Sequence, residues 1–141
     1  MEQKRVGGCQ CGAVRYEAEG PVAHETLCHC TFCRRASAAP VVAWFSVPPK
    51  AFRLTKGRLK IFQSSPEVAR GFCADCGTPI TYQRNGLAEL DVTTCSLDDP
   101  ETTPPRDHTF ARSALAWAPV EDGLPRYPTL REHPEASARK R

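Results

Sequence analysis

The sequence predicts a mainly β protein built from short antiparallel strands. Turns are frequent, because the 141 residues include 13 prolines and 9 glycines. Residues with β-branched and aromatic side chains cluster in short runs between these turns, which favours strands over long helices. The dipeptide Asn85-Gly86 lies between two such runs and is a strong signal for a β-hairpin.

The first half of the chain shows two strand patterns and one helical segment. Apolar and charged side chains alternate from Val14 onward, so residues 14–19 are predicted to form a half-buried strand that ends at Gly20-Pro21. Residues 31–37 are predicted to form a short helical turn. The apolar run 41–47 is enclosed by prolines and is predicted to be a buried strand.

The second half of the chain shows two hairpin patterns. Residues 52–54 and 59–62 flank a turn that contains Gly57, and residues 80–83 and 87–92 flank the turn at Asn85-Gly86. Three further segments complete the prediction. They are a strand at 68–72, a turn at 97–100 and a last strand or packed extended segment at 110–117.

Charge and length indicate one domain over residues 3–128, followed by a polar, disordered tail over residues 129–141. The net charge is +3, and residues 131–141 contribute +2 of it through four basic and two acidic side chains. The nearly neutral body argues against a nucleic-acid partner, which a concentrated basic face would bind. No signal peptide or membrane span is evident, so we expect a cytoplasmic protein without a membrane partner.

Eight cysteines dominate the chemistry of the sequence. Thiols stay reduced in the cytoplasm, so this number argues for metal binding or catalysis, with a disulfide framework as the alternative. Seven of the cysteines fall into three clusters, and Cys95 stands alone. The clusters are Cys9-Gln-Cys11-Gly12, Cys28-His-Cys-Thr-Phe-Cys33 and Cys73-Ala-Asp-Cys76-Gly77.

The first and third clusters are predicted to form one closed zinc site. Two thiolates separated by two residues can bind one tetrahedral ion, and the following glycine allows a tight turn. A closed structural site needs four ligands, so Cys9 and Cys11 are the natural partners of Cys73 and Cys76. Such a site would supply much of the folding free energy of a small domain.

The second cluster is predicted to form a different, open zinc site. Cys28, Cys30 and Cys33 lie close enough in the sequence to bind one ion from one loop, which leaves a fourth position for a substrate. A thiol substrate suits this fourth position, because zinc binds its sulfur as the nucleophilic thiolate. Two alternatives remain: a fourth ligand from Cys95, His29 or His24 would close the site, or the cysteines could be metal-free redox thiols. Two zinc ions are therefore predicted in total, with zinc favoured over iron by ligand softness and geometry.

The cysteine motifs resemble those of the glutathione-dependent formaldehyde-activating enzymes, which share the CENP-V/GFA domain. The resemblance covers nearly the whole chain apart from the tail. It departs after the second motif, where family members often carry glycine, a small residue and phenylalanine, and this chain has Ala38-Ala-Pro-Val41. The motifs that carry it are Gly7-Gly-Cys-Gln-Cys-Gly-Ala-Val-Arg-Tyr16, Cys28-His-Cys-Thr-Phe-Cys-Arg-Arg35, Arg70-Gly-Phe-Cys-Ala-Asp-Cys-Gly-Thr-Pro79, Leu97-Asp-Asp-Pro100 and Pro125-Arg-Tyr127.

The resemblance implies a β-tent fold of antiparallel sheets around zinc. It implies a structural zinc on Cys9, Cys11, Cys73 and Cys76 and a catalytic zinc on Cys28, Cys30 and Cys33. The implied reaction joins glutathione to formaldehyde and is formally that of a carbon–sulfur lyase. A non-catalytic zinc module that binds a thiol or another molecule is the alternative, and a redox or metal-buffering protein is a third possibility.

The remaining polar and aromatic residues have simpler interpretations. Cys95 is predicted to be a buried inert thiol, and Trp44 and Phe45 are predicted to be core residues. His29 is predicted to point away from the metal, and His108 and His133 to lie at the surface. Arg34 and Arg35 either meet a substrate carboxylate or are solvated. Asp98 and Asp99 are predicted to form a turn before Pro100.

Overall fold

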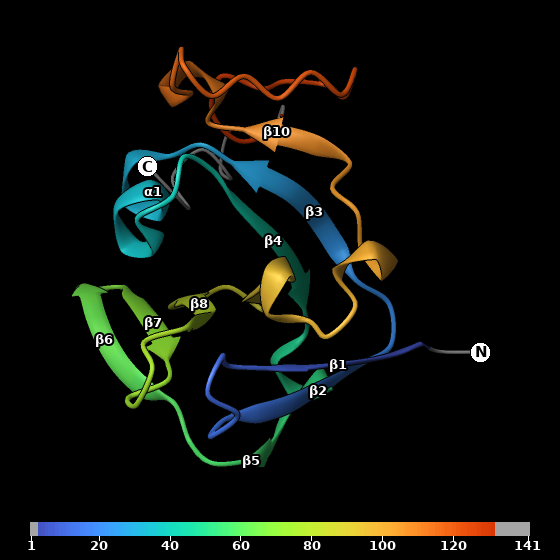
Figure 1. Cartoon of the computed structure of the whole chain (residues 1–141), viewed down its shortest axis with the longest axis vertical. Helices are drawn as coiled ribbons and strands as arrows, with labels where there is room; N and C mark the ends of the chain where they lie inside the picture. Colours follow the sequence, from blue (N-terminus) through green and yellow to red (C-terminus); the bar gives the residue numbers. More distant parts are fainter. Residues whose placement is uncertain (1–2, 132–141) are drawn as a thin grey trace. The chain divides into compact units, whose positions relative to one another are not determined.

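The structure is a computed structural model that describes residues 3–131, and it confirms the predicted mainly β fold (Figure 1). Within these residues the chain forms one α-helix, α1, four short 3-10 helices and ten strands. None of these helices is long and apolar enough to cross a membrane. The bounds are β1 Lys4–Gly8, β2 Arg15–Glu19, β3 Ala23–Cys28, α1 Thr31–Ser37, β4 Val42–Val47, β5 Phe52–Lys56, β6 Lys60–Ser65, β7 Val68–Phe72, β8 Pro79–Arg84, β9 Leu90–Thr93 and β10 Asp107–Thr109.

The chain divides into two compact units. The first unit comprises the N-terminal segment up to Ala23 together with Phe45–Thr103, and the second comprises His24–Trp44 together with the chain from Pro104 onward. The single domain predicted over residues 3–128 thus contains two units, and the strand β4 contributes residues to both of them.

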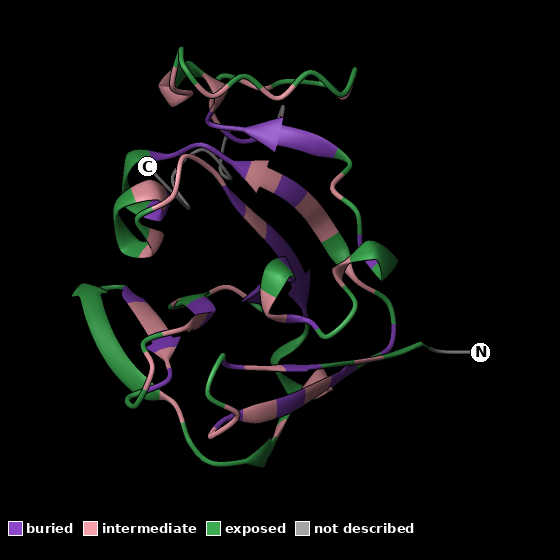
Figure 2. Ribbon diagram, viewed as in Figure 1, coloured by how far each residue is buried: buried purple, intermediate pink, exposed green. Residues whose placement is uncertain are grey.

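The first unit contains two antiparallel arrangements. One is the three-stranded sheet β1-β2-β5, and the other is the strand series β9-β8-β7-β6. Fully buried side chains from both arrangements, among them Tyr16, Ile80 and Val92, form one apolar cluster with Phe45. The outermost strand of the series, β6, is exposed along its whole length (Figure 2).

The second unit contains the strand order β10-β3-β4, in which β10 runs parallel to β3. The chain after β10 returns alongside it: the backbone N–H of Tyr127 donates to the carbonyl of His108, and that of Phe110 donates to the carbonyl of Thr129. Leu130 is buried, and the Arg131 guanidinium forms two hydrogen bonds with the Asp107 carboxylate. The first residues assigned to the tail are therefore packed, and residues 132–141 lie outside the described part of the chain.

Several local predictions are confirmed. The helix covers the predicted residues 31–37, the strands at 14–19, 41–47 and 68–72 are present within one residue of their predicted ends, and β8 and β9 pair across the turn at Asn85-Gly86. Trp44 and Phe45 are buried as predicted, and a 3-10 turn follows Asp99.

One prediction of strand pairing and one of strand position are wrong. The strands β5 and β6 exist, but they do not form a hairpin: β5 pairs with β2, where Phe52 stacks on Tyr16 with ring centroids 5.0 Å apart, and β6 pairs with β7. The packing of Phe52 against Tyr16 thus outweighs the hairpin signal of the turn that contains Gly57. The segment 110–117 begins with a 3-10 helix, Ala111–Ser113, instead of a strand, and β10 precedes it.

Replacement of Ile80 by alanine is expected to lower the free energy of unfolding by about 2–5 kcal/mol, because it leaves a cavity in the main apolar cluster. Ile80 is fully buried, whereas Ile61 on β6 is 56% exposed. The control Ile61→Ala should change the free energy of unfolding by less than about 0.5 kcal/mol. Urea titrations of the two variants measure the difference, and equal losses would show that the cluster is not the stabilising core.

Candidate metal centres

The sulfur atoms of seven cysteines gather in two groups among the described residues. In each group the sulfurs all lie within 4.8 Å of one another. The grouping is the one that the sequence predicts: four cysteines from the first and third clusters, and three from the second. None of the seven is paired in a disulfide in this structure.

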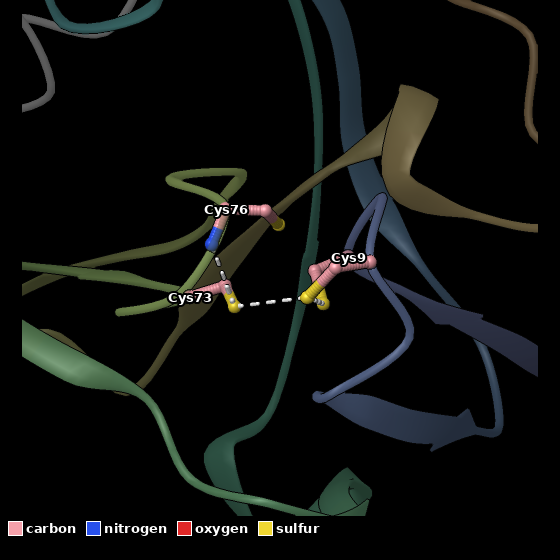
Figure 3. A group of neighbouring side chains, drawn as sticks. Cys9, Cys73 and Cys76 are labelled. Carbon is pink, nitrogen blue, oxygen red and sulfur yellow. Dashed lines mark hydrogen bonds between the residues drawn. The ribbon is translucent and has the colours of Figure 1, made fainter.

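The four-cysteine group lies between two loops of the first unit (Figure 3). Cys9 and Cys11 lie in the loop between β1 and β2, and Cys73 and Cys76 lie in the loop between β7 and β8. The Cys9 and Cys11 sulfurs are 3.6 Å apart, and the Cys11 and Cys73 sulfurs are 3.8 Å apart. Four thiolates around one tetrahedral zinc, each at about 2.3 Å, have their sulfurs about 3.8 Å apart, so this donor set fits such an ion.

Backbone N–H groups point at the sulfurs of this group. Val14 N–H donates to the Cys9 sulfur over 3.2 Å, and the N–H groups of Asp75 and Cys76 each lie 3.4 Å from the Cys73 sulfur. Hydrogen bonds from the hydroxyl and backbone of Thr78 lower the pKa of the Cys76 thiol to about 5. Such donors stabilise the thiolate, which is the form that binds a metal ion.

Glycine is required in both loops for a conformational reason. Gly12 and Gly77 have φ angles of 81° and 83°, in the left-handed region that side chains disfavour. At these positions the chain turns back, so that Gly12 N–H donates to the Cys9 carbonyl and Gly77 N–H donates to the Cys73 carbonyl. The turns bring each pair of cysteines to one side of its loop.

The three-cysteine group lies in the second unit, where β3 ends and α1 begins. Cys28 is the last residue of β3, Cys30 caps the helix, and Cys33 lies in its first turn. The Cys30 sulfur accepts the Cys33 N–H over 3.2 Å, and the Cys28 and Cys33 sulfurs are 3.5 Å apart. All three cysteines are at most 1% exposed.

No fourth ligand side chain joins the three-cysteine group within residues 3–131. The group contains no histidine, aspartate or glutamate, so His24 and His29 are not part of it. Cys95, predicted to be a buried thiol, is instead exposed in the 3-10 helix Thr94–Ser96 and belongs to neither group. The buried-thiol prediction fails because the strand β9 ends at Thr93, before this cysteine.

A chain of three hydrogen-bonded polar side chains lies next to the three cysteines, with His29 and His108 buried and Asp122 exposed. His29 Nε2 is 2.8 Å from His108 Nδ1, and His108 Nε2 is 2.9 Å from a carboxylate oxygen of Asp122. Because the carboxylate can only accept, His108 carries a proton on Nε2, and in the neutral ring its Nδ1 accepts the N–H of His29. Burial lowers the pKa of His29 to about 4, which keeps this ring neutral near pH 7.

The sequence alone does not predict this chain of residues. His108 was expected at the surface, but it is fully buried because β10 pairs with β3 beside it. The predicted surface position of His133 lies outside the described residues. No local pattern links the three members, since His29 and His108 are 79 positions apart.

The geometry defines a class of protein: a mainly β, cysteine-rich protein with two thiol groups that could each bind a metal ion. The family described as glutathione-dependent formaldehyde-activating enzyme matches residues 4–113, and the chain belongs to this family. The crystal structure of a Rhodobacter sphaeroides protein is also similar, with 22% sequence identity and a TM-score of 0.56. The match covers 86% of this chain and 98% of that chain, and it supports the fold alone.

Replacement of Gly77 by alanine is expected to weaken metal retention by the four-cysteine group. The left-handed backbone there costs a side-chain-bearing residue about 1–2 kcal/mol, and relaxation of the turn would move Cys76 away from its partners. Gly86 has the same φ of 83° in a turn without ligands, so Gly86→Ala is the matched control. Both variants should lose stability, but only Gly77→Ala should release metal faster to a chelator. Equal release rates would contradict the role of this turn.

Proposed function

We propose that the protein is a zinc-dependent enzyme of the carbon–sulfur lyase type, which adds a small-molecule thiol such as glutathione to a small aldehyde such as formaldehyde. The observation that carries the proposal is the unequal size of the two thiol groups. One group has four sulfurs, and the other has three with no further ligand side chain beside them in residues 3–131. Family membership supports glutathione and formaldehyde as the substrates.

The proposed ligands are divided between two ions. Cys9, Cys11, Cys73 and Cys76 would hold a structural zinc, and Cys28, Cys30 and Cys33 would hold a catalytic zinc. Soft thiolate ligands with tetrahedral spacing favour zinc, although iron also accepts such a set. The catalytic ion would supply Lewis acidity, which favours the thiolate form of the substrate sulfur.

The reaction needs no oxidant or reductant. The substrate sulfur gives its electron pair to the aldehyde carbon, a carbon–sulfur bond forms, and the carbonyl π bond opens. The aldehyde oxygen becomes a hydroxyl by taking one proton, which equals the proton that the thiol loses. The protein therefore has to orient sulfur and carbon and to limit the access of water, and the almost complete burial of Cys28, Cys30 and Cys33 serves this purpose.

The chain from Asp122 through His108 to His29 would hold the cysteine loop in place. His29 lies between Cys28 and Cys30, and its backbone N–H donates to the Thr109 carbonyl over 3.0 Å. Both the backbone and the ring of His29 are thus fixed to β10 and its surroundings. In this role the three polar residues position the ligands without contacting the substrate.

The cytoplasm remains the proposed compartment. None of the eight cysteines is paired in a disulfide, which agrees with a compartment where cellular reductants keep disulfides rare.

The two groups are expected to respond differently to the loss of one sulfur. Cys30→Ser should lower thiol–aldehyde addition more than about 100-fold while circular dichroism stays near wild type, because this group holds only the catalytic ion. Cys76→Ser should unfold the protein or make it insoluble, because structural zinc contributes about 10–16 kcal/mol in small domains. Cys95→Ser is the control and should keep both activity and fold, since Cys95 is exposed and outside both groups.

The reverse pattern would contradict this division of roles. A folded, active Cys30→Ser variant would favour a non-catalytic zinc module. Reversible oxidation of Cys30 and Cys33 without metal loss would favour a redox protein. Metal analysis of the purified chain tests the stoichiometry of two ions directly.

Replacement of Asp122 by asparagine is expected to weaken cobalt binding at the three-cysteine group about tenfold, because the carboxylate no longer orients His108. The charge-transfer band between thiolate and cobalt should shift as the ligand loop relaxes. The neighbour Glu121 is exposed, so Glu121→Gln is the matched control and should behave as wild type. If Asp122→Asn leaves the charge-transfer band and the cobalt affinity unchanged, the Asp122 carboxylate does not position the metal ligands.

A further inference from the structure

A cavity of about 390 Å³ lies against α1 in the second unit. Its wall includes Thr31, Arg34 and Arg35 from the helix, Pro40 from the segment after it, and Trp117 from the chain beyond β10. Trp117 is 74% exposed, which is unusual for so large an apolar side chain. The bond-making step of the proposed reaction assigns no role to this cavity.

The cavity is positively charged, and no carboxylate among residues 3–131 balances its two arginines. None of its lining residues is acidic, and neither arginine forms an ion pair with any of the described residues. The Nε atom of Arg34 is buried and has no hydrogen-bond partner within the described chain. An unmade hydrogen bond at a buried charged group is costly, so the arrangement favours an anionic ligand that would accept it.

The cavity and the three cysteines share one turn of helix. Thr31 follows Cys30 directly, Arg34 follows Cys33 directly, and Arg34 N–H donates to the Cys30 carbonyl over 3.0 Å. Residues 31–35 span only about 6 Å along the helix axis. The cysteines themselves do not line the cavity. A ligand with its sulfur beside them would have to extend past the first turn of α1 to reach Arg34, a distance that a peptide-sized thiol can span.

We propose that this cavity binds the carboxylate of the thiol substrate, with Arg34 and Arg35 as its partners and Trp117 against the body of the ligand. The inference rests on the proposed function, and it restricts the substrate class to carboxylate-bearing thiols such as cysteinyl peptides. A guanidinium matches a carboxylate through paired hydrogen bonds, and an exposed indole offers a flat apolar surface. Neutral thiols would bind the same sulfur position without this contact.

The test compares a charged ligand with its uncharged ester. In the cobalt-loaded protein, glutathione is expected to bind at least about tenfold more tightly than its dimethyl ester, measured by the cobalt absorption band. The double variant Arg34→Gln/Arg35→Gln should remove this preference and leave the affinity for the ester unchanged. Arg58 is exposed and distant in sequence from both cysteine groups, so Arg58→Gln is the control and should keep the preference.

A second measurement separates the carboxylate site from the proposed reaction. S-Methylglutathione has no free thiol, and its binding is followed by the fluorescence of Trp117 with Trp117→Phe as the blank. Quenching in the wild type that is lost in the arginine variant supports the site, even if no thiol perturbs the cobalt band, which would overturn the proposed function. Equal affinities for acid and ester in the wild type would overturn the carboxylate site.

Discussion

Four sulfur atoms from two loops meet within 4.8 Å, although Cys11 and Cys73 are 62 positions apart in the sequence. This meeting sets the arrangement of the first unit. The loop between β1 and β2 must face the loop between β7 and β8, and each must present its cysteines on one side. Cys9 and Cys73 are buried in an apolar cluster with Val14, so the convergence is also part of the core. Four thiols brought this close need a common ion to compensate their charge when they ionise.

The parts of the fold that the sequence predicts are those with short-range causes. The helix α1 follows from residues 31–37 themselves, with Cys30 as its cap, and the β8–β9 hairpin follows from the Asn-Gly turn. The partner of β5 and the parallel pairing of β10 with β3 depend on contacts far apart in the chain. Turn residues indicate where a strand ends, but the burial of Tyr16 decides which strand lies next to β5.

The same distinction applies to the candidate site. Spacing alone separates the seven cysteines into a group of four and a group of three, because ligand geometry limits which neighbours can share an ion. Spacing gives no information about Asp122, His108 and His29. They meet because β10 pairs with β3 and the chain after β10 returns alongside His108. Arg34 and Arg35 were seen as possible anion ligands, but the cavity that they line depends on Trp117, more than eighty positions away.

The sequence separation of the two cysteine groups has a consequence for synthesis on the ribosome. Cys28, Cys30 and Cys33 emerge together within six residues, whereas the four-cysteine group is incomplete until Cys76 has been made. At about 5–20 residues per second, the last two cysteines of that group follow several seconds after the first two. The three-cysteine group can therefore bind an ion while most of the polypeptide has not yet been synthesised. The four-cysteine group is completed afterwards.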